Sequence, residues 1–582
     1  MTEFMVDRNY PPAIRILDHL IKTEGENENL NYRKGLCLLY SKAHDNRTSL
    51  AYLEKASKNI NKKYDGVSDS ETGANEDVIF YLAKSNFINE NLSKAENLYL
   101  QFLEGKKKKN DAMKIVAEAE LTQVRNAKKL MDKPKDLTID NLGRQINSRY
   151  PDYAPVITLD GQALYYTSRR LWKDSSNLDM IDPQTNQFLE DVYVSYMDFD
   201  REWTDPVRLD FCLPERHEAT VTVSQDESKV YLYQDDNGIG NIYYSVLSGT
   251  EFTDIKKVEG KINSDAWETH LTFTHDGQNA YFVSDREGGL GGRDIWRMVR
   301  FSNGEWSEPY NLGAPVNSIY DEDAPFIGVD NKTLYYSSNG LKSMGGFDVF
   351  RTILNDEDKW SPPINMGYPL NTVVDDIFFT TTADGHTGFL SSNRADGHGE
   401  KDIYKVYDLE PEMMGISTLK GLISTTDGSL IPDDFRIEVS CSNCDNYPIK
   451  IVSPRKVNGG YFSKLESCRD FKVEFYQGET LLKSEIVQTE CNDEFQIFKR
   501  DYILDVENKK FTDPKPKDPI IPADTYVFKG AEMKHYFSYN ANKLDNSNQE
   551  LKSFLKTALL KLLITNQTLI IMLFLWRKLK HF

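Results

Sequence analysis

Basic charge is scarce in this chain of 582 residues. Asp and Glu number 90 against 70 Lys and Arg, which leaves a net charge of −20. A protein that binds nucleic acid needs clustered positive charge against the phosphates, so this balance excludes nucleic acid as a partner. The one basic run, residues 106–109, is followed by Asn110 and Asp111, and we interpret it as the solvated end of a helix.

Motifs of the common catalytic sites are also absent. The sequence contains no Gly-x-Ser-x-Gly elbow, no Walker loop and no His-Glu-x-x-His zinc motif. Glycine-rich stretches occur at residues 288–292, 345–346 and 397–399, but each lies between two predicted strands rather than before a helix. We interpret them as hairpin loops that need positive φ, not as phosphate cradles. The sequence therefore predicts no catalytic residue, no cofactor and no metal.

The chain also lacks a long apolar run. The C-terminal run at residues 569–576 is shorter than the roughly 20 residues that a membrane-spanning helix needs. Residues 1–8 contain neither the basic region nor the apolar segment of a signal peptide, and no lipobox cysteine.

A repeat with five copies fills the middle of the chain. Each copy has an Asp-led turn, and these turns begin at Asp160, Asp226, Asp276, Asp330 and Asp384. A strand-like run follows each turn, and a second run then begins at Asp191, Asn241, Asp294, Asp348 and Asp402, the last three 54 residues apart. A period near fifty, built of strands and turns, is typical of a four-stranded blade. The repeat predicts a five-bladed β-propeller over residues 136–410, or a six-bladed one if a degenerate blade lies in the longer first copy.

The ends of the repeat predict how the ring closes. Three copies end in an Asn-Ser or Asn-Thr pair, at Asn263, Asn317 and Asn371. The fifth copy lacks this ending, yet the same pair stands at Asn147, before the first turn. We therefore expect the segment before the first turn to supply the outer strand of the last blade, which removes the exposed sheet edges.

One carboxylate stands eight residues before every Asp-led turn: Asp152, Glu218, Glu268, Glu322 and Asp376. These residues should open the innermost strands, so together they could ring one mouth of the central channel and bind a cation or a basic peptide. The alternative is a structural latch, in which each acid accepts a hydrogen bond from the residue eight positions after the turn. Those residues are Ser168, Gln234, Ser284, Ser338 and Ser392.

The same five acids bear on an enzymatic interpretation. A propeller glycosidase or peptidase-like enzyme would use a channel pair of Asp or Glu. A glycosidase needs two differently placed carboxylates, whereas these recur once per blade in one register. We therefore favour a binding protein over an enzyme. His217, His270 and His386 lie near the predicted inner strands, and we expect them to be packed rather than catalytic.

Residues 1–135 are predicted to be helical. Apolar residues recur at helical spacing, for example at Ile14, Leu17 and Ile21. Small residues such as Gly35 and Ala56 are expected where paired helices cross. The pattern resembles tetratricopeptide repeats, which would present a concave face to a protein. A plain helical cap on the propeller is the alternative.

Residues 415–506 are predicted to form a small β-sandwich. Apolar and polar residues alternate from Phe435 and from Phe471, and Asn458 with two glycines after it marks a hairpin. The segment resembles a carboxypeptidase regulatory-like domain.

Four of the six cysteines fall in this segment, at Cys441, Cys444, Cys468 and Cys491. Four cysteines in a small β-domain predict two disulfides, with the pairing open among three arrangements, and hence an oxidising compartment. A zinc site and free thiols are the alternatives. Cys37 is expected in the core of the helices.

The C-terminal part begins with a Pro-rich linker over residues 507–530. Residues 531–582 follow. Their first part, from His535 to Leu555, resembles the first strand and helix of an OmpA-like peptidoglycan-binding domain. The later motifs of that domain do not follow. We expect a truncated or frameshifted reading frame here, and a C-terminal membrane anchor is the alternative.

The whole order of segments resembles the multidomain OmpA-family envelope proteins of Bacteroidota, with a propeller of the TolB or WD40-like type. It is similar to their peptidoglycan-binding outer-membrane component associated with type IX secretion. The resemblance implies a non-catalytic scaffold at the periplasmic face of the outer membrane, with envelope or secretion-machine proteins as partners. Intact relatives would also bind peptidoglycan, and in this chain that tether is expected to fail. Such proteins are exported, so either the native start lies elsewhere than Met1 or the protein stays inside the cell, and the expected disulfides favour the former.

Overall fold

The computed structural model describes residues 2–512 except 42–44, 69, 106–110, 183–184, 199–200, 225–226, 237, 249, 341, 410–415, 445–446 and 492–495. The basic run, Asp226, most of the predicted linker and all of residues 531–582 lie outside the described residues. Within the described part, no helix is both long and apolar enough to cross a membrane.

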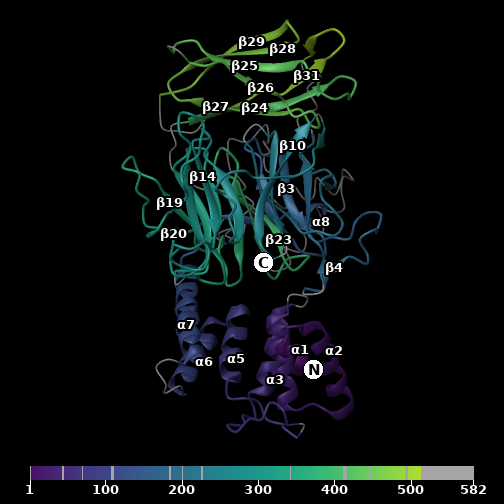
Figure 1. The fold of residues 1–582 in the computed structure, drawn as a ribbon, viewed down its shortest axis with the longest axis vertical. Helices are drawn as coiled ribbons and strands as arrows, with labels where there is room; N and C mark the ends of the chain where they lie inside the picture. Colours follow the sequence, from purple (N-terminus) through teal and green to yellow (C-terminus); the bar gives the residue numbers. More distant parts are fainter. Residues whose placement is uncertain are drawn as a thin grey trace, which may run out of the picture. The chain divides into compact units, whose positions relative to one another are not determined.

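The N-terminal segment is helical, as its periodicity predicts. The helices are α1 (Thr2–Val6), α2 (Tyr10–Glu24), α3 (Glu28–Tyr40), α4 (Ser49–Ala56), α5 (Val78–Ile88), α6 (Leu92–Gly105) and α7 (Ala112–Met131), with a 3-10 turn at Asn46–Thr48 (Figure 1). Sequential helices pack on one another. A Cβ at Gly35 of α3 would lie 2.7 Å from the side chain of Leu53 on α4, so a small residue is required at this crossing.

Five antiparallel sheets follow, which we call blades 1 to 5. Blade 1 contains β2 (Asp152–Ile157), β3 (Ala163–Ser168), β6 (Asp191–Tyr196) and β7 (Val207–Arg208). Blade 2 contains β8 (Glu218–Val223), β9 (Lys229–Asp235), β10 (Gly240–Ser248), β11 (Glu251–Phe252) and β12 (Lys256–Lys257). Blade 3 contains β13 (Glu268–Phe273), β14 (Asn279–Ser284), β15 (Asp294–Val299) and β16 (Tyr310–Asn311). Blade 4 contains β17 (Glu322–Ile327), β18 (Thr333–Ser338), β19 (Asp348–Ile353) and β20 (Ile364–Asn365).

Blade 5 closes the ring with strands from both ends of the repeat. It contains β21 (Asp376–Thr381), β22 (Gly388–Ser392) and β23 (Asp402–Tyr407), and its outer strand is β1 (Thr138–Asn141). β1 pairs antiparallel with β23, from Thr138 opposite Tyr407 to Asn141 opposite Tyr404. The first strands β2, β8, β13, β17 and β21 contact one another in sequence, and β21 contacts β2. The predicted closure of the ring by the preceding segment is therefore observed.

The longer first copy contains a small hairpin rather than further blade strands. β4 (Ile181–Asp182) pairs only with β5 (Gln187–Phe188), in a two-stranded sheet of its own. A short helix, α8 (Gly143–Ile146), connects β1 to blade 1. The blades themselves are held together by apolar side chains from neighbouring sheets. Tyr281 and Ile295 of blade 3, for example, form one buried cluster with Leu334 and Phe350 of blade 4.

The glycine-rich loops need glycine for a different reason from the one that the sequence predicted. Within these three loops only Gly288 has positive φ, at 95°. The other glycines are needed because the loop touches the next blade. A Cβ at Gly291 would lie 2.1 Å from the carbonyl oxygen of Tyr320, and one at Gly345 would lie 2.3 Å from that of Thr372.

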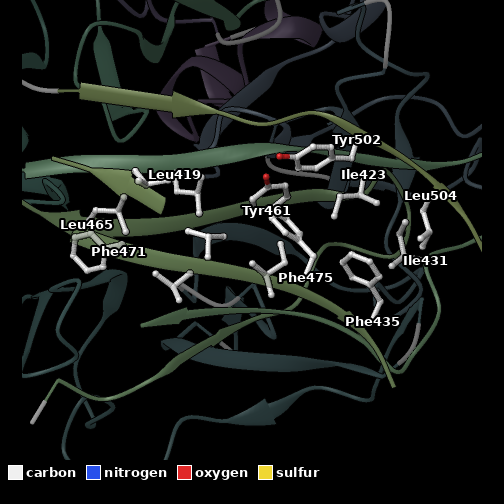
Figure 2. Close-up of a cluster of buried hydrophobic side chains, with 14 residues drawn as sticks. Leu419, Ile423, Ile431, Phe435, Tyr461, Leu465, Phe471, Phe475, Tyr502 and Leu504 are labelled. Carbon is white, nitrogen blue, oxygen red and sulfur yellow. The ribbon is translucent and has the colours of Figure 1, made fainter. Parts of the chain in front are cut away.

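The segment after the ring is a sandwich of two sheets. One contains β24 (Ile416–Thr425), β27 (Gly460–Glu466), β30 (Gln496–Lys499), β31 (Tyr502–Asp505) and β32 (Lys510–Thr512). The other contains β25 (Phe435–Cys441), β26 (Lys450–Val452), β28 (Asp470–Gln477) and β29 (Thr480–Gln488). Alternate side chains of both sheets, among them Leu419, Tyr461, Phe471 and Phe475, fill the space between them (Figure 2).

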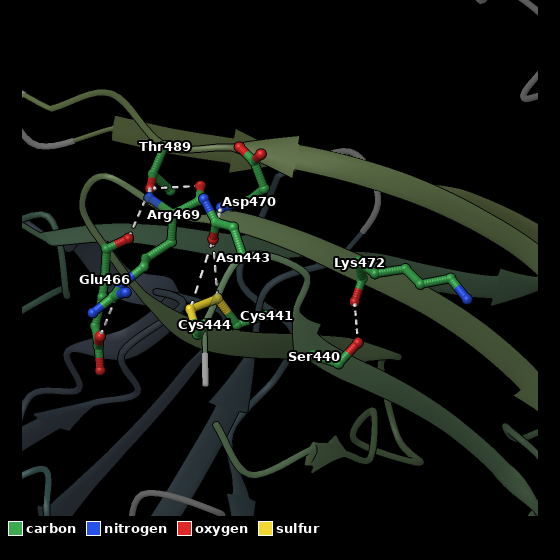
Figure 3. The surroundings of a disulfide bond; sticks show 9 residues. All are labelled: Ser440, Cys441, Asn443, Cys444, Glu466, Arg469, Asp470, Lys472 and Thr489. Atoms are coloured by element: carbon green, nitrogen blue, oxygen red, sulfur yellow. Dashed lines mark hydrogen bonds and ion pairs between the residues drawn. A yellow bond between two sulfur atoms is a disulfide. The ribbon is translucent and has the colours of Figure 1, made fainter. Parts of the chain in front are cut away.

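Two disulfides lie at one end of the sandwich. Cys441 is bonded to Cys444, and Cys468 is bonded to Cys491. The loop of the first disulfide is tied to β28, because the Asn443 side chain accepts a hydrogen bond from the Asp470 amide (Figure 3). Beside it, Thr489 after β29 bonds to the backbone of Arg469 before β28. Cys37 and Cys212 are free and buried.

Candidate functional site

The five predicted carboxylates open the first strand of each blade, and all of them are buried. Their exposed fractions do not exceed 1%. Among the described residues, the only group of three or more Asp, Glu, His and Cys with ligand atoms within 4.8 Å of one another is Asp191, Cys212 and Glu218. Among the described residues, the structure therefore does not bring three of the five acids close enough together to share one ion.

Four of the five acids accept local hydrogen bonds. Glu268 accepts bonds from the hydroxyls of Ser264 (2.7 Å) and Ser284 (2.8 Å). Glu322 has the same two partners in its own blade, Ser318 (2.7 Å) and Ser338 (2.8 Å). These contacts are the predicted latch, with one addition: the serine four residues before the acid.

An arginine completes the latch in three blades. Arg170, Arg286 and Arg394 form ion pairs with Asp152 (2.6 Å), Glu268 (2.9 Å) and Asp376 (2.8 Å). Sequence reasoning missed these partners. The signal was present, because the Ser or Thr recurs four residues before each of these acids and the Arg recurs eighteen residues after it.

Glu218 of blade 2 is the exception. Neither of its carboxylate oxygens has a side-chain hydrogen-bond partner among the described residues, and only the backbone N–H of Leu213 there opposes the rise of its pKa as a donor. Gln234 stands opposite it in β9, where the other blades have serine, and Asp236 stands where three of them have arginine. Burial, reinforced by the charge of Asp191, raises the pKa of Glu218 to about 7. Burial also raises the pKa of Asp376, although Arg394 opposes it.

The central channel is narrow where the first strands approach one another. Residues from all five first strands line a cavity of about 30 Å³, among them His270 and Phe378. The two rings are tilted by 38° to one another, with their centroids 5.1 Å apart. A cavity of this size accommodates about one water molecule. It is too small for a sugar or peptide substrate.

Two ion-pair groups lie beside this constriction. Glu190 binds Arg169 (2.9 Å) and His217 (3.0 Å), and Asp323 binds His270 (2.8 Å). Burial alone would raise the pKa of both acids, but these cationic partners outweigh it and hold each pKa below its ordinary range. His217 and His270 are therefore packed against acids. His386, the third histidine of the sequence prediction, bonds to the carbonyl oxygen of Leu409 (3.0 Å).

A larger cavity, of about 690 Å³, opens at the end of the first strands that carries the Asp-led turns. Its lining combines charged and aromatic side chains: Glu227, Lys229, Tyr231, Tyr244, Glu259, Arg300 and Trp306. A concave site of this size with both apolar surface and placed polar groups is typical of a binding site.

The sandwich contacts the ring at these same turns. Arg455 forms ion pairs with Asp160 of the first turn and Glu227 of the second. The side chain of Asn458 donates to the carbonyl oxygen of Gln162 (3.2 Å), and Lys464 donates to that of Val329 (3.0 Å). The helices contact the opposite ends of the strands, where Asn126 of α7 donates to the carbonyl oxygen of Ser343 (2.9 Å).

No protein-family model matches the chain, and no curated protein matches it in sequence. Comparison with solved structures finds propeller proteins. The putative TolB from Agrobacterium tumefaciens has 12% identity and a TM-score of 0.28, and the match covers 62% of this chain and 93% of that one. TolB from Acinetobacter baumannii has 18% identity and a TM-score of 0.26, over 45% of this chain and 55% of that one.

Enzymes occur among the similar structures as well. A gluconolactonase from Xanthomonas campestris has 12% identity and a TM-score of 0.26, over 48% of this chain and 92% of that one. At these identities and TM-scores the likenesses do not separate a binding protein from an enzyme.

Proposed function

We propose that this protein is a non-catalytic scaffold of the bacterial envelope, which binds protein partners through its five-bladed propeller and its helical segment. The observation that supports a binding role is that most of the inner carboxylates are engaged in contacts within the ring. Four of the five are neutralised or hydrogen-bonded within their own blade, and the channel between them holds about 30 Å³. An enzyme that used these acids would need room for a substrate beside them.

The cavity of about 690 Å³ is the surface to which we assign a partner. It offers aromatic rings and an arginine, Tyr231, Tyr244, Trp306 and Arg300, which are residue types that protein interfaces favour. We expect a segment of an envelope or secretion-machine protein to bind there. In intact relatives the OmpA-like domain would hold the complex to peptidoglycan at the outer membrane.

The test is retention of a partner from a bacterial envelope extract. The double variant Lys229→Glu and Arg300→Glu reverses two charges that line the cavity. The control, Lys359→Glu, reverses an exposed charge paired with Glu357. We expect one protein to be retained by the wild type and the control and to be lost with the double variant. Equal retention by all three would contradict this assignment of the surface.

An enzyme of the gluconolactonase or peptidase class is the second candidate. It would use a pair of inner carboxylates, and besides the five acids that open the first strands, the buried pair Glu190 and Asp323 is the one to test. Turnover of a lactone, glycan or peptide by the purified chain, abolished by Glu190→Gln, would replace our proposal with this one. We expect no turnover, because both acids are already engaged by Arg169, His217, Arg293 and His270.

A further inference from the structure

The junction between blades 1 and 2 differs from the other junctions in the residues whose side chains bond one blade to the next. Elsewhere an asparagine binds the backbone of the preceding blade, as Asn317 does with the amide and carbonyl of Ile295 (both 2.9 Å). The following serine or threonine binds the next acid. At this junction the pair is Cys212 and Leu213. Cys212 occupies the asparagine position, because its sulfur accepts a hydrogen bond from the amide of Val192 (3.2 Å).

These replacements remove every side-chain donor from Glu218. Leu213 has no hydroxyl, Gln234 replaces the serine of the second strand, and Asp236 replaces the arginine. Glu218 is 0% exposed, and in the described part of the chain no side chain donates to its oxygens, although the backbone N–H of Leu213 faces it. A buried carboxylate without side-chain partners is costly, so something that the protein side chains do not supply must compensate it.

The side chains around Glu218 offer electron pairs rather than hydrogens. One carboxylate oxygen of Asp191, the sulfur of Cys212 and one oxygen of Glu218 lie within 4.8 Å of one another, and the three residues are at most 3% exposed. Gln234, directly opposite Glu218 and 6% exposed, has an amide oxygen without a partner among the described residues. Its NH₂ group binds Asp236 instead (3.2 Å). Gln234 is not one of the three clustered residues, so it is an independent sign that a positive group belongs here.

The geometry points to a binding site for a divalent metal ion of the zinc class, and we propose that Asp191, Cys212 and Glu218 are its ligands, with Gln234 or a water in the fourth position. Thiolate together with carboxylate oxygens is a ligand set that Zn²⁺ accepts in tetrahedral sites. Ca²⁺ and Mg²⁺ prefer oxygen ligands only, so the sulfur favours zinc over either.

The surroundings of Asp191 suit a ligand. Its oxygens accept hydrogen bonds from the indole of Trp172 (2.7 Å) and from Arg208 (3.2 Å), which fix the carboxylate in the way that outer residues orient metal ligands. The charges also balance. A divalent ion and the Arg208 guanidinium together neutralise two carboxylates and one thiolate. In the absence of a metal, protons on Glu218 and Cys212 give the same balance, and that is the alternative to be tested.

The experiment uses the full chain, freed of metal with a chelator and then incubated with Zn²⁺ or Co²⁺. The metal content is measured after gel filtration. We expect one equivalent of zinc, and with cobalt a thiolate-to-metal charge-transfer band. Glu218→Gln and Cys212→Ser should each reduce the bound metal at least tenfold. Glu322→Gln, which changes the equivalent acid of blade 4, should retain one equivalent, and so should Cys37→Ser.

Folding of each variant is checked by circular dichroism. If Cys212→Ser fails to fold, Asp191→Asn and Glu218→Gln carry the test. The proposal is overturned if the wild type binds less than stoichiometric metal, if Glu218→Gln binds as much as the wild type, or if cobalt binds without the thiolate band. The first result would leave a proton as the group that neutralises Glu218, and the other two would mean that the metal binds elsewhere than at Glu218 and Cys212.

Discussion

Arg455 of the sandwich forms an ion pair with Asp160 at the first Asp-led turn of the ring. The side chain of Arg455 is 6% exposed and that of Asp160 is fully buried. Glu227, at the second turn, binds the same guanidinium. One arginine thus joins the sandwich to two neighbouring blades. The positive charge of Arg455 is complementary to these turns, because each of them carries an acidic residue.

Replacing Arg455 should destabilise the contact between sandwich and ring. Arg455→Ala leaves Asp160 buried without its cation, which costs about 3–5 kcal/mol when a buried pair is broken. We expect a lower midpoint of thermal unfolding, measured by calorimetry. Arg469→Ala, which removes an exposed ion pair in the same sandwich, is the control and should leave the midpoint unchanged. An equal response of the two variants would show that the Arg455 pairs do not form in solution.

The two acids Glu268 and Glu218 should respond oppositely to the same substitution. Glu268→Gln removes the charge that neutralises Arg286 and should reduce the free energy of unfolding by about 3 kcal/mol. In chelator-treated protein, Glu218→Gln should cost nothing or stabilise, because no side-chain donor faces that carboxylate. Urea denaturation of both variants measures the difference. A loss for Glu218→Gln as large as that for Glu268→Gln would mean that Glu218 also has a partner in solution.

Gly291 should not tolerate a side chain. The Cβ of Gly291→Ala would lie 2.1 Å from the backbone oxygen of Tyr320, so blades 3 and 4 must separate. We expect a loss of about 1–3 kcal/mol, the cost of overpacking. The control is Gly105→Ala at the end of α6, where nothing lies within 4 Å. Chemical denaturation should show no loss there, since alanine favours helix.

Acid should weaken the fold through His275. Burial, aided by the charges of Lys464 and Lys450, lowers the pKa of His275 to about 4. In the unfolded chain the pKa is about 6.5, so between these two values the unfolded state binds the extra proton. The free energy of unfolding should therefore fall as the pH falls from about 6.5 to about 4, by on the order of 1 kcal/mol after allowance for partial exposure.

The measurement is the pH dependence of unfolding together with an NMR titration of the ring protons. His275→Gln should flatten the profile over this range, whereas His19→Gln, an exposed position of α2, should leave it as in the wild type. A ring that titrates near 6.5 in the folded protein would refute the prediction.

The two disulfides should contribute unequally. Cys468 and Cys491 are 23 residues apart, while Cys441 and Cys444 are 3 apart. In the chain-entropy account the longer loop stabilises by about 3 kcal/mol and the shorter by about 2 kcal/mol. The double variant Cys468→Ala and Cys491→Ala should therefore unfold at the lower temperature of the two pairs, as measured by calorimetry. The reverse order would indicate that strain or residual structure outweighs loop length.

Much of the ring could be predicted because its repeat consists of patterns of residues that are close together in the sequence. Strand alternation, Asp-led turns and the displaced Asn147 ending each depend on a few neighbouring residues, and together they predicted closure by β1. The helices were predictable from their apolar period for the same reason. The division of the chain into named domains stays a prediction.

The contacts that distinguish one blade from another could be predicted from the sequence only in part. The latch acids and their serines were visible in the sequence, yet Arg286 was not linked to Glu268 because they are neighbours only across the sheet. Arg455 is 228 residues from Glu227, and no local pattern connects them. The sequence shows that Glu218 lacks the usual partners, since Gln234 and Asp236 stand where other blades have serine and arginine. The proposal of a metal site also required the position of Cys212, which only the structure gives.

The pairing of β1 with β23 has a consequence for how the protein is made. The Asn141 side chain binds Asp402, 261 residues further along the chain. While the ribosome works through that interval, the first strand has no neighbour to pair with. The toroid can therefore be sealed only after its final strand has been synthesised, and until then β1 is an unpaired strand edge.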